Sequence, residues 1–207
     1  HPPHRGRLCT AADRRKGVKI IMTSYEFTLR FRLPEAKPDP ETWVDRLYEA
    51  GCDDATIGTG RRGLIGLVFA RSATSAAKAI SSAVRDVQRA IPGAEIVSAE
   101  PDLVNLSDLA KLTGFTRQNM RKYAVGEMQS VRAFFPPPAV SGPENYWRLA
   151  EVSVWMGVNT SVKFDPSLID LAYETSRVNL KAQETRLRQS HNQRAKLPRR
   201  SPTGAAA

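Results

Sequence analysis

The stretch from Leu106 to Tyr123 constrains the fold more than any other part of the sequence. It predicts two short helices joined by a sharp corner. Ser107 is a favourable N-cap for the first helix, and Gly114 supplies the positive φ that commonly ends one. Ala110 lies four residues before Gly114, and small residues at this spacing let two helices cross closely. Thr116 is then the expected N-cap of the second helix.

The second helix has one apolar side and one polar side. Met120 and Tyr123, three residues apart, are expected to face the core. The opposite side then carries side chains that are nearly all hydrogen-bond donors: Arg117, Gln118, Arg121 and Lys122. This pattern is typical of a DNA-binding helix-turn-helix, and the alternative interpretation is an ordinary helical hairpin within a core.

The residues after these helices predict a wing and a third helix. The segments Phe134–Val140 and Tyr146–Arg148 are expected to form a two-stranded wing around a turn at Ser141–Asn145. A helix is then expected over Ala150–Met156, ending at Gly157, with its apolar residues turned inward.

Together these segments resemble the winged helix-turn-helix of the MerR superfamily, especially its small phage-regulator and excisionase members of the AlpA type. The resemblance covers Leu103 to about Val158. Such proteins combine a capping Thr or Ser, a buried aliphatic residue, an Arg and an aromatic residue with a wing that begins Phe-Pro and a helix that carries Glu-Val and Trp. The matching residues are Thr116, Met120, Arg121, Tyr123, Phe135-Pro136, Glu151-Val152 and Trp155.

The resemblance implies DNA contacts for particular residues. Arg117 and Gln118 hold positions that approach base edges in the major groove, whereas Arg121 and Tyr123 hold positions that touch phosphates. Arg148 resembles a further phosphate ligand. The complete set expected to bind DNA is Thr116, Arg117, Gln118, Asn119, Arg121, Lys122, Tyr123, Asn145, Tyr146 and Arg148. The family's effector-sensing region is missing here, so the resemblance implies nothing about an inducer.

Residues 24–102 alternate strand and helix patterns. The order strand, helix, strand, strand, helix, strand predicts a ferredoxin-like α+β sandwich, with two helices on one face of an antiparallel sheet. The expected elements are a strand at Tyr25–Leu33, a helix from Asp39-Pro40 to Gly51, a hairpin of Ala55–Gly58 and Leu64–Ala70, a helix at Ser75–Ile91 and a strand at Ala94–Ser98.

Several motifs invite a catalytic or ligand-binding interpretation. Gly58–Gly63 matches G-x-G-x-x-G, but a strand follows it where a dinucleotide site needs a helix, so a hairpin turn is expected. Arg61 and Arg62 at its tip are candidates for a phosphate or partner contact. Asp53-Asp54 is expected to be solvated, and Cys52 to be an inert buried thiol. No catalytic residues, metal ligands or cofactor are predicted, because the histidines, His1, His4 and His191, all fall in expected tails.

Charge and composition set the remaining limits. The net charge is +10, but residues 1–23 and 161–207 each carry +5, so the excess lies near the ends and is only permissive for DNA binding. Two cysteines fit a reducing cytoplasm, and no apolar run is long enough to span a membrane. The predicted segments are a disordered or non-native leader at 1–23, the sandwich at 24–102, the winged domain at 103–160, a helix at 161–189 and a disordered basic tail at 190–207.

These patterns predict a cytoplasmic, nucleoid-associated regulator of bacterial or phage type that binds double-stranded DNA, and not an enzyme. One short helix covers few base pairs, so a homodimer on two half-sites is expected. The alternative is a protein-interaction module, such as an antitoxin or a recombination directionality factor, whose N-terminal domain binds a partner protein. A pull-down of a stoichiometric partner by residues 24–102 would favour that alternative.

Overall fold

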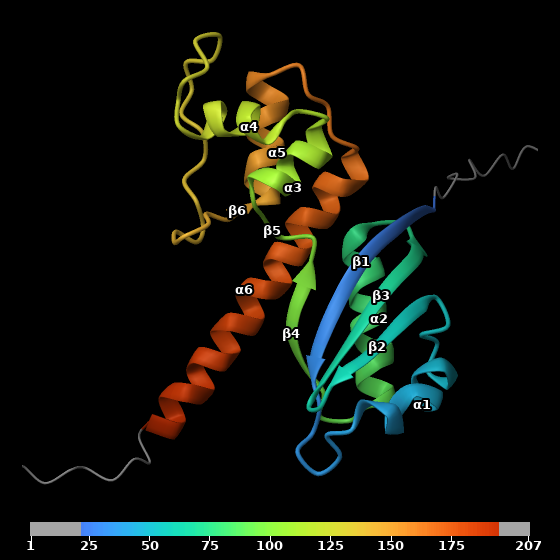
Figure 1. The fold of residues 1–207 in the computed structure, drawn as a ribbon. Helices are drawn as coiled ribbons and strands as arrows, with labels where there is room; N and C mark the ends of the chain where they lie inside the picture. Colours follow the sequence, from blue (N-terminus) through green and yellow to red (C-terminus); the bar gives the residue numbers. More distant parts are fainter. Residues whose placement is uncertain (1–21, 195–207) are drawn as a thin grey trace, which may run out of the picture.

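The computed structural model describes residues 22–194, and the expectations for the leader up to residue 21 and for the tail from residue 195 lie outside this range. The chain is a mixed α+β protein (Figure 1). Its elements are β1 (Thr23–Arg32), η1 (Pro40–Trp43), α1 (Val44–Glu49), β2 (Ala55–Arg61), β3 (Leu64–Ala73), α2 (Ala76–Ala90), β4 (Glu95–Glu100), β5 (Leu103–Val104), α3 (Leu106–Thr113), α4 (Arg117–Ala124), β6 (Trp147–Arg148), α5 (Leu149–Asn159) and α6 (Pro166–Arg194). None of the helices within residues 22–194 combines the length and the apolar character needed to cross a membrane.

The first four strands form one antiparallel sheet in the order β2-β3-β1-β4. Successive side chains of a strand point to opposite faces, so Phe27 and Leu29 of β1 are buried beside Phe69 and Ala99 on its two neighbours. Helices α1 and α2 cover this buried face (Figure 1). The other face carries exposed side chains such as Arg30. The predicted sequence of strands and helices in this region is therefore present.

Local signals in the sequence explain where these elements begin and end. The Ser75 side chain accepts a hydrogen bond from the backbone N–H of Lys78 and caps α2, which ends before Pro92-Gly93. The hairpin between β2 and β3 turns at Gly63, whose φ is +80°. The hairpin interpretation of Gly58–Gly63 is thus confirmed.

A buried arginine ties the sheet to its helices. The Arg71 side chain is 9% exposed and donates to both carboxylate oxygens of Asp54, at 2.7 and 2.8 Å, and to Asp86 at 2.7 Å. These carboxylates raise the pKa of Arg71 further above its ordinary value, so it stays charged despite its burial. The expectation that both acids of Asp53-Asp54 are solvated is wrong for Asp54. Cys52 is fully buried beside this cluster, and burial raises its pKa to about 11.

Helix α6 belongs to two hydrophobic cores. Leu171 packs in the core under the sheet, and its neighbour Ala172 packs in a second core built by α3, α4 and α5. The Asn179 side chain donates to the Ala99 carbonyl at 2.8 Å and accepts from its N–H at 2.7 Å, which satisfies the free edge of β4. The helix continues to Arg194, past the end predicted at residue 189, so residues 190–194 are helical and were wrongly assigned to the tail.

The second core holds the segment predicted as a winged domain, and two predictions there need correction. Of the predicted second wing strand, Trp147-Arg148 pairs with β5. Only Tyr146 pairs with the Phe134–Val140 segment, through a single bridge to Val140. The burial of Trp147 explains this, because Trp147 packs in the second core next to β5 and therefore cannot lie on an exposed wing. Helix α5 also runs through Gly157 to Asn159.

Candidate nucleic-acid interface

The first helix of the α3–α4 pair begins at an Asx cap. Asn105, immediately after β5, accepts hydrogen bonds from the backbone N–H groups of Ser107 and Asp108, both at 2.9 Å. Asp108 bonds back to the Asn105 N–H at 3.2 Å, which completes a capping box. Asn105 is thus the N-cap, and the assignment of Ser107 was wrong by two residues. At the other end Gly114 adopts a φ of +73°, as predicted.

The buried side of α4 fixes the direction of its polar side. Thr116 caps the helix through the Asn119 N–H at 3.1 Å, Met120 is fully buried, and Tyr123 is 8% exposed. The Tyr123 ring lies 6.0 Å from Phe115 and 6.1 Å from Trp155, measured between centroids. Four side chains of α4 consequently face solvent: Arg117, Gln118, Arg121 and Lys122. Tyr123 was predicted to contact DNA as well as the core, and the structure places its ring in the core.

Arg148 was predicted to bind a phosphate, but its guanidinium is already occupied. Its Nη1 donates to both carboxylate oxygens of Asp102, at 2.9 and 2.8 Å, and the Arg148 side chain is 18% exposed. Asp102 also accepts from Ser176 and from Asn179 of α6. Arg148 therefore joins β6 to α6 through Asp102, and the function proposed below assigns it no DNA contact.

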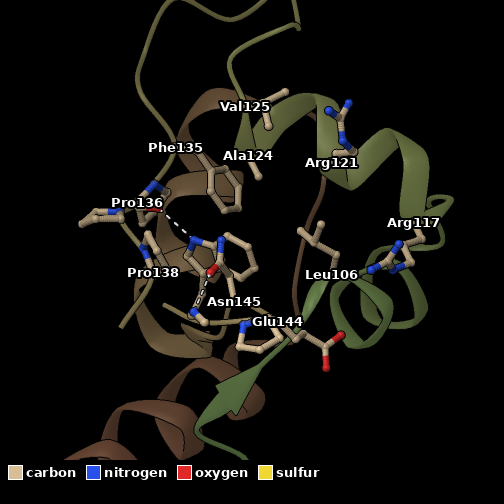
Figure 2. A pocket seen from close by; sticks show the side chains of 14 residues that line it. Leu106, Arg117, Arg121, Ala124, Val125, Phe135, Pro136, Pro138, Glu144 and Asn145 are labelled. Atoms are coloured by element: carbon tan, nitrogen blue, oxygen red, sulfur yellow. Dashed lines mark hydrogen bonds between the residues drawn. The ribbon is translucent and has the colours of Figure 1, made fainter. Parts of the chain in front are cut away.

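A groove separates α4 from the loop that leads to β6 (Figure 2). Its volume is about 530 Å³. Arg117 and Arg121 stand on the α4 side, and Pro136–Pro138 and Gly142–Asn145 form the loop side. Trp147 also lines the groove. The Trp147 Nε1–H donates to the Pro136 carbonyl at 3.0 Å, and this hydrogen bond fixes the loop side of the groove.

The predicted wing residues lie on the loop side of the groove. Asn145 is exposed, and its side-chain oxygen accepts from the Gly142 N–H at 3.3 Å, so it shapes the turn. Tyr146 is partly exposed, and its hydroxyl donates to Glu144 at 3.0 Å, which raises the pKa of Tyr146. The Glu144 carboxylate makes this edge of the groove less favourable for a phosphate than the α4 edge.

Positive charge on α4 is largely free of internal partners. Arg121 lies 3.6 Å from Glu127 in an exposed pair, with 58% of the Arg121 side chain accessible. Within residues 22–194 no carboxylate lies within salt-bridge distance of Arg117 or Lys122. The same range holds no cluster of three metal-ligating side chains. The chemistry that this surface offers is binding of an anion or of hydrogen-bond acceptors.

Sequence reasoning missed the junction between the two cores. Asp102 receives its donors from β6 and α6, which are 46 or more residues further along the chain. An acidic residue after a proline at the end of a strand carries no pattern that identifies such partners. A buried aspartate at this place is visible only once the elements are packed.

No family model matches the sequence, and no curated protein or solved structure matches it either. The functional interpretation of the α4 surface therefore depends on its geometry and charge.

Proposed function

We propose that this protein binds double-stranded DNA in a sequence-specific manner and acts as a transcriptional regulator, with α4 in the major groove. One observation carries the proposal. Met120 and Tyr123 anchor α4 in the second core, so its four long donor side chains all project from the opposite side. A short helix that presents arginine, glutamine and lysine together matches the donor and acceptor pattern of base edges and phosphates.

We also propose finer names for the two parts of the fold. The sheet order β2-β3-β1-β4 with its two covering helices supports a ferredoxin-like sandwich. The α3–α4 corner at Gly114, the supporting α5 and the loop closed by the Val140–Tyr146 bridge support a winged helix-turn-helix. The wing in this proposal is a loop held by one bridge and by Trp147, in place of a regular two-stranded ribbon.

The proposal divides the α4 side chains by role. Arg117 and Gln118 occupy the first turn, which enters the groove in helix-turn-helix proteins, and they read base edges. Arg121 and Lys122, one turn later, bind the phosphates beside it, together with the Thr116 and Asn119 end of the helix. A single α4 spans few base pairs, so two protomers on two half-sites provide the specificity.

Two substitutions separate these roles. Arg117→Ala should lose about 1 to 3 kcal/mol on the preferred site and little on a scrambled site, because it removes a base contact. Arg121→Ala should weaken both duplexes by similar amounts, because phosphates are present in every sequence. Fluorescence anisotropy with labelled duplexes measures both effects.

The matched control is Arg85→Ala, which removes an exposed arginine from α2, a helix that packs under the sheet and away from α4. It should leave both affinities unchanged. Unchanged affinity in the Arg117 and Arg121 variants, or an equal loss in the Arg85 variant, would contradict the assignment of α4 as the reading helix.

A further inference from the structure

Phe134 is the most exposed large hydrophobic residue in the described part of the chain. Its side chain is 94% accessible, compared with 78% for Val158, the next most exposed. It lies in the loop between α4 and β6, which stands away from the helices of its module (Figure 1). A phenylalanine in this position leaves an entire aromatic ring in water, and burying such a ring on a partner is strongly favourable.

The neighbours of Phe134 hold it in this position. Phe135 points the opposite way and packs edge-on against Trp155, with centroids 4.9 Å apart, and against Trp147 at 5.9 Å. Val131, on the other side, packs on the same core and donates its N–H to the Met128 carbonyl at 3.1 Å. Phe134 is thus an outward residue between two anchored ones.

The chain after Phe135 adds stiffness. Pro136, Pro137 and Pro138 each have a restricted φ, and the Pro136 carbonyl is bonded to Trp147. The loop therefore resists folding back to bury the Phe134 ring against its own protein. An exposed ring on a stiff, anchored loop keeps its position when it is pressed against a partner, as a side chain that inserts between two bases must.

The surroundings favour a nucleic-acid partner for this ring. Arg132, two residues away, is exposed, and the loop continues directly from α4 with its exposed Arg121 and Lys122. The exposed loop residues near Phe134 are otherwise apolar (Ala133, Pro137, Ala139 and Val140), and Arg132 is the only charged residue between Glu127 and Glu144. An aromatic ring beside a single positive charge suits a partner that offers stackable bases and phosphates. Proteins that bend DNA insert single apolar side chains of this kind between base pairs from the minor groove.

We propose that Phe134 inserts between two base pairs in the minor groove next to the major groove occupied by α4, and that it bends the duplex. This inference rests on the proposed function. The Phe134 ring partly unstacks one base step. Because the loop that carries the ring is anchored, the duplex bends at this step and lies against both α4 and the wing. Steps that unstack easily, pyrimidine followed by purine, are the preferred insertion sites.

The experiment uses the full chain and a duplex of about 30 base pairs, three helical turns, that contains the sequence the protein enriches from a random pool. Donor and acceptor dyes at the two ends report bending by energy transfer, and anisotropy of the same samples reports binding. 2-Aminopurine placed at each step flanking the α4 site brightens where a base is unstacked. The variants are Phe134→Ala, Phe134→Leu and, as the matched control, Val158→Ala, which removes an exposed apolar residue from α5.

The wild-type protein should bend the duplex by about 20° to 90° and brighten 2-aminopurine at one step. Phe134→Ala should abolish the bend and the brightening and weaken binding by about 5- to 100-fold, the usual range for losing one aromatic stack on a base. Phe134→Leu should keep much of the bend, and Val158→Ala should match the wild type. Tight binding to an unbent duplex, or a bend that persists in Phe134→Ala, overturns the insertion of Phe134 but leaves the proposed function intact. No binding to any duplex overturns both.

Discussion

Replacing Asp102 with alanine should remove a large part of the stability of the whole chain. The Asp102 side chain is 4% exposed and accepts hydrogen bonds from three residues: Arg148, Ser176 and Asn179. Its own carbonyl accepts from the Leu149 N–H at 2.7 Å, so it lies where β5, β6 and α6 meet.

The magnitude follows from what the substitution leaves behind. Removing one partner of a buried ion pair costs about 3 to 5 kcal/mol, because the remaining charge is stranded. Arg148 is 18% exposed, and Asn179 keeps its bond to the Ala99 carbonyl, so we expect a value near the lower end, about 3 kcal/mol. A loss of this size is a substantial fraction of the free energy of unfolding of a folded domain, which is typically about 5 to 15 kcal/mol.

Urea unfolding followed by circular dichroism measures this loss. The matched control is Glu100→Ala, two residues earlier, where the ion pair with Arg30 is half-exposed and should contribute less than about 1 kcal/mol. Adding Arg148→Met to Asp102→Ala should recover part of the loss, because no buried charge is then left unpaired. Equal effects of Asp102→Ala and Glu100→Ala would refute the reasoning.

Three further predictions concern single residues. Asn105→Ala should lower the free energy of unfolding by about 1 kcal/mol, because it removes the cap of α3, whereas Ser107→Ala should change it by less than about 0.5 kcal/mol; the reverse order in urea titrations would restore Ser107 as the cap. In a Cys9→Ala background, Cys52 should react with a thiol reagent at pH 8 only after unfolding, and rapid reaction of the folded protein would contradict its burial. Burial raises the pKa of Cys52 from about 9 in the unfolded chain to about 11 in the folded protein. The free energy of unfolding should therefore fall by about 2 to 3 kcal/mol as the pH rises from 9 to 11. A Cys52→Ser variant should lack this fall, and an equal fall in both proteins would contradict the assignment to Cys52.

Local patterns identified most of the elements because each is fixed by neighbours in the sequence. The alternating residues of β1, the Ser75 cap of α2 and the Gly114 corner depend on spacing within a few residues. The outward direction of the α4 donors followed from Met120 and Tyr123 in the same way.

The errors arose where tertiary partners decide the outcome. Asp54 and Arg148 looked like solvated or DNA-facing charges, and both are paired with residues remote in the sequence. The end of α6 was placed too early, because its apolar positions are sparse although Asn179 and Ala182 are buried against the sheet. The exposure of Phe134 beside the partly buried Phe135 could not be predicted either, since two adjacent phenylalanines carry no signal of which one faces the core.

Selection of DNA from a random-sequence pool by the purified full chain tests the central claim most directly. The proposed function predicts enrichment of a recurrent sequence with two related half-sites, and selection with the Arg117→Ala protein should yield a motif degraded at the positions that Arg117 reads. Pools that stay indistinguishable from the starting mixture, or an identical motif with the Arg117→Ala protein, would contradict the claim that α4 reads DNA.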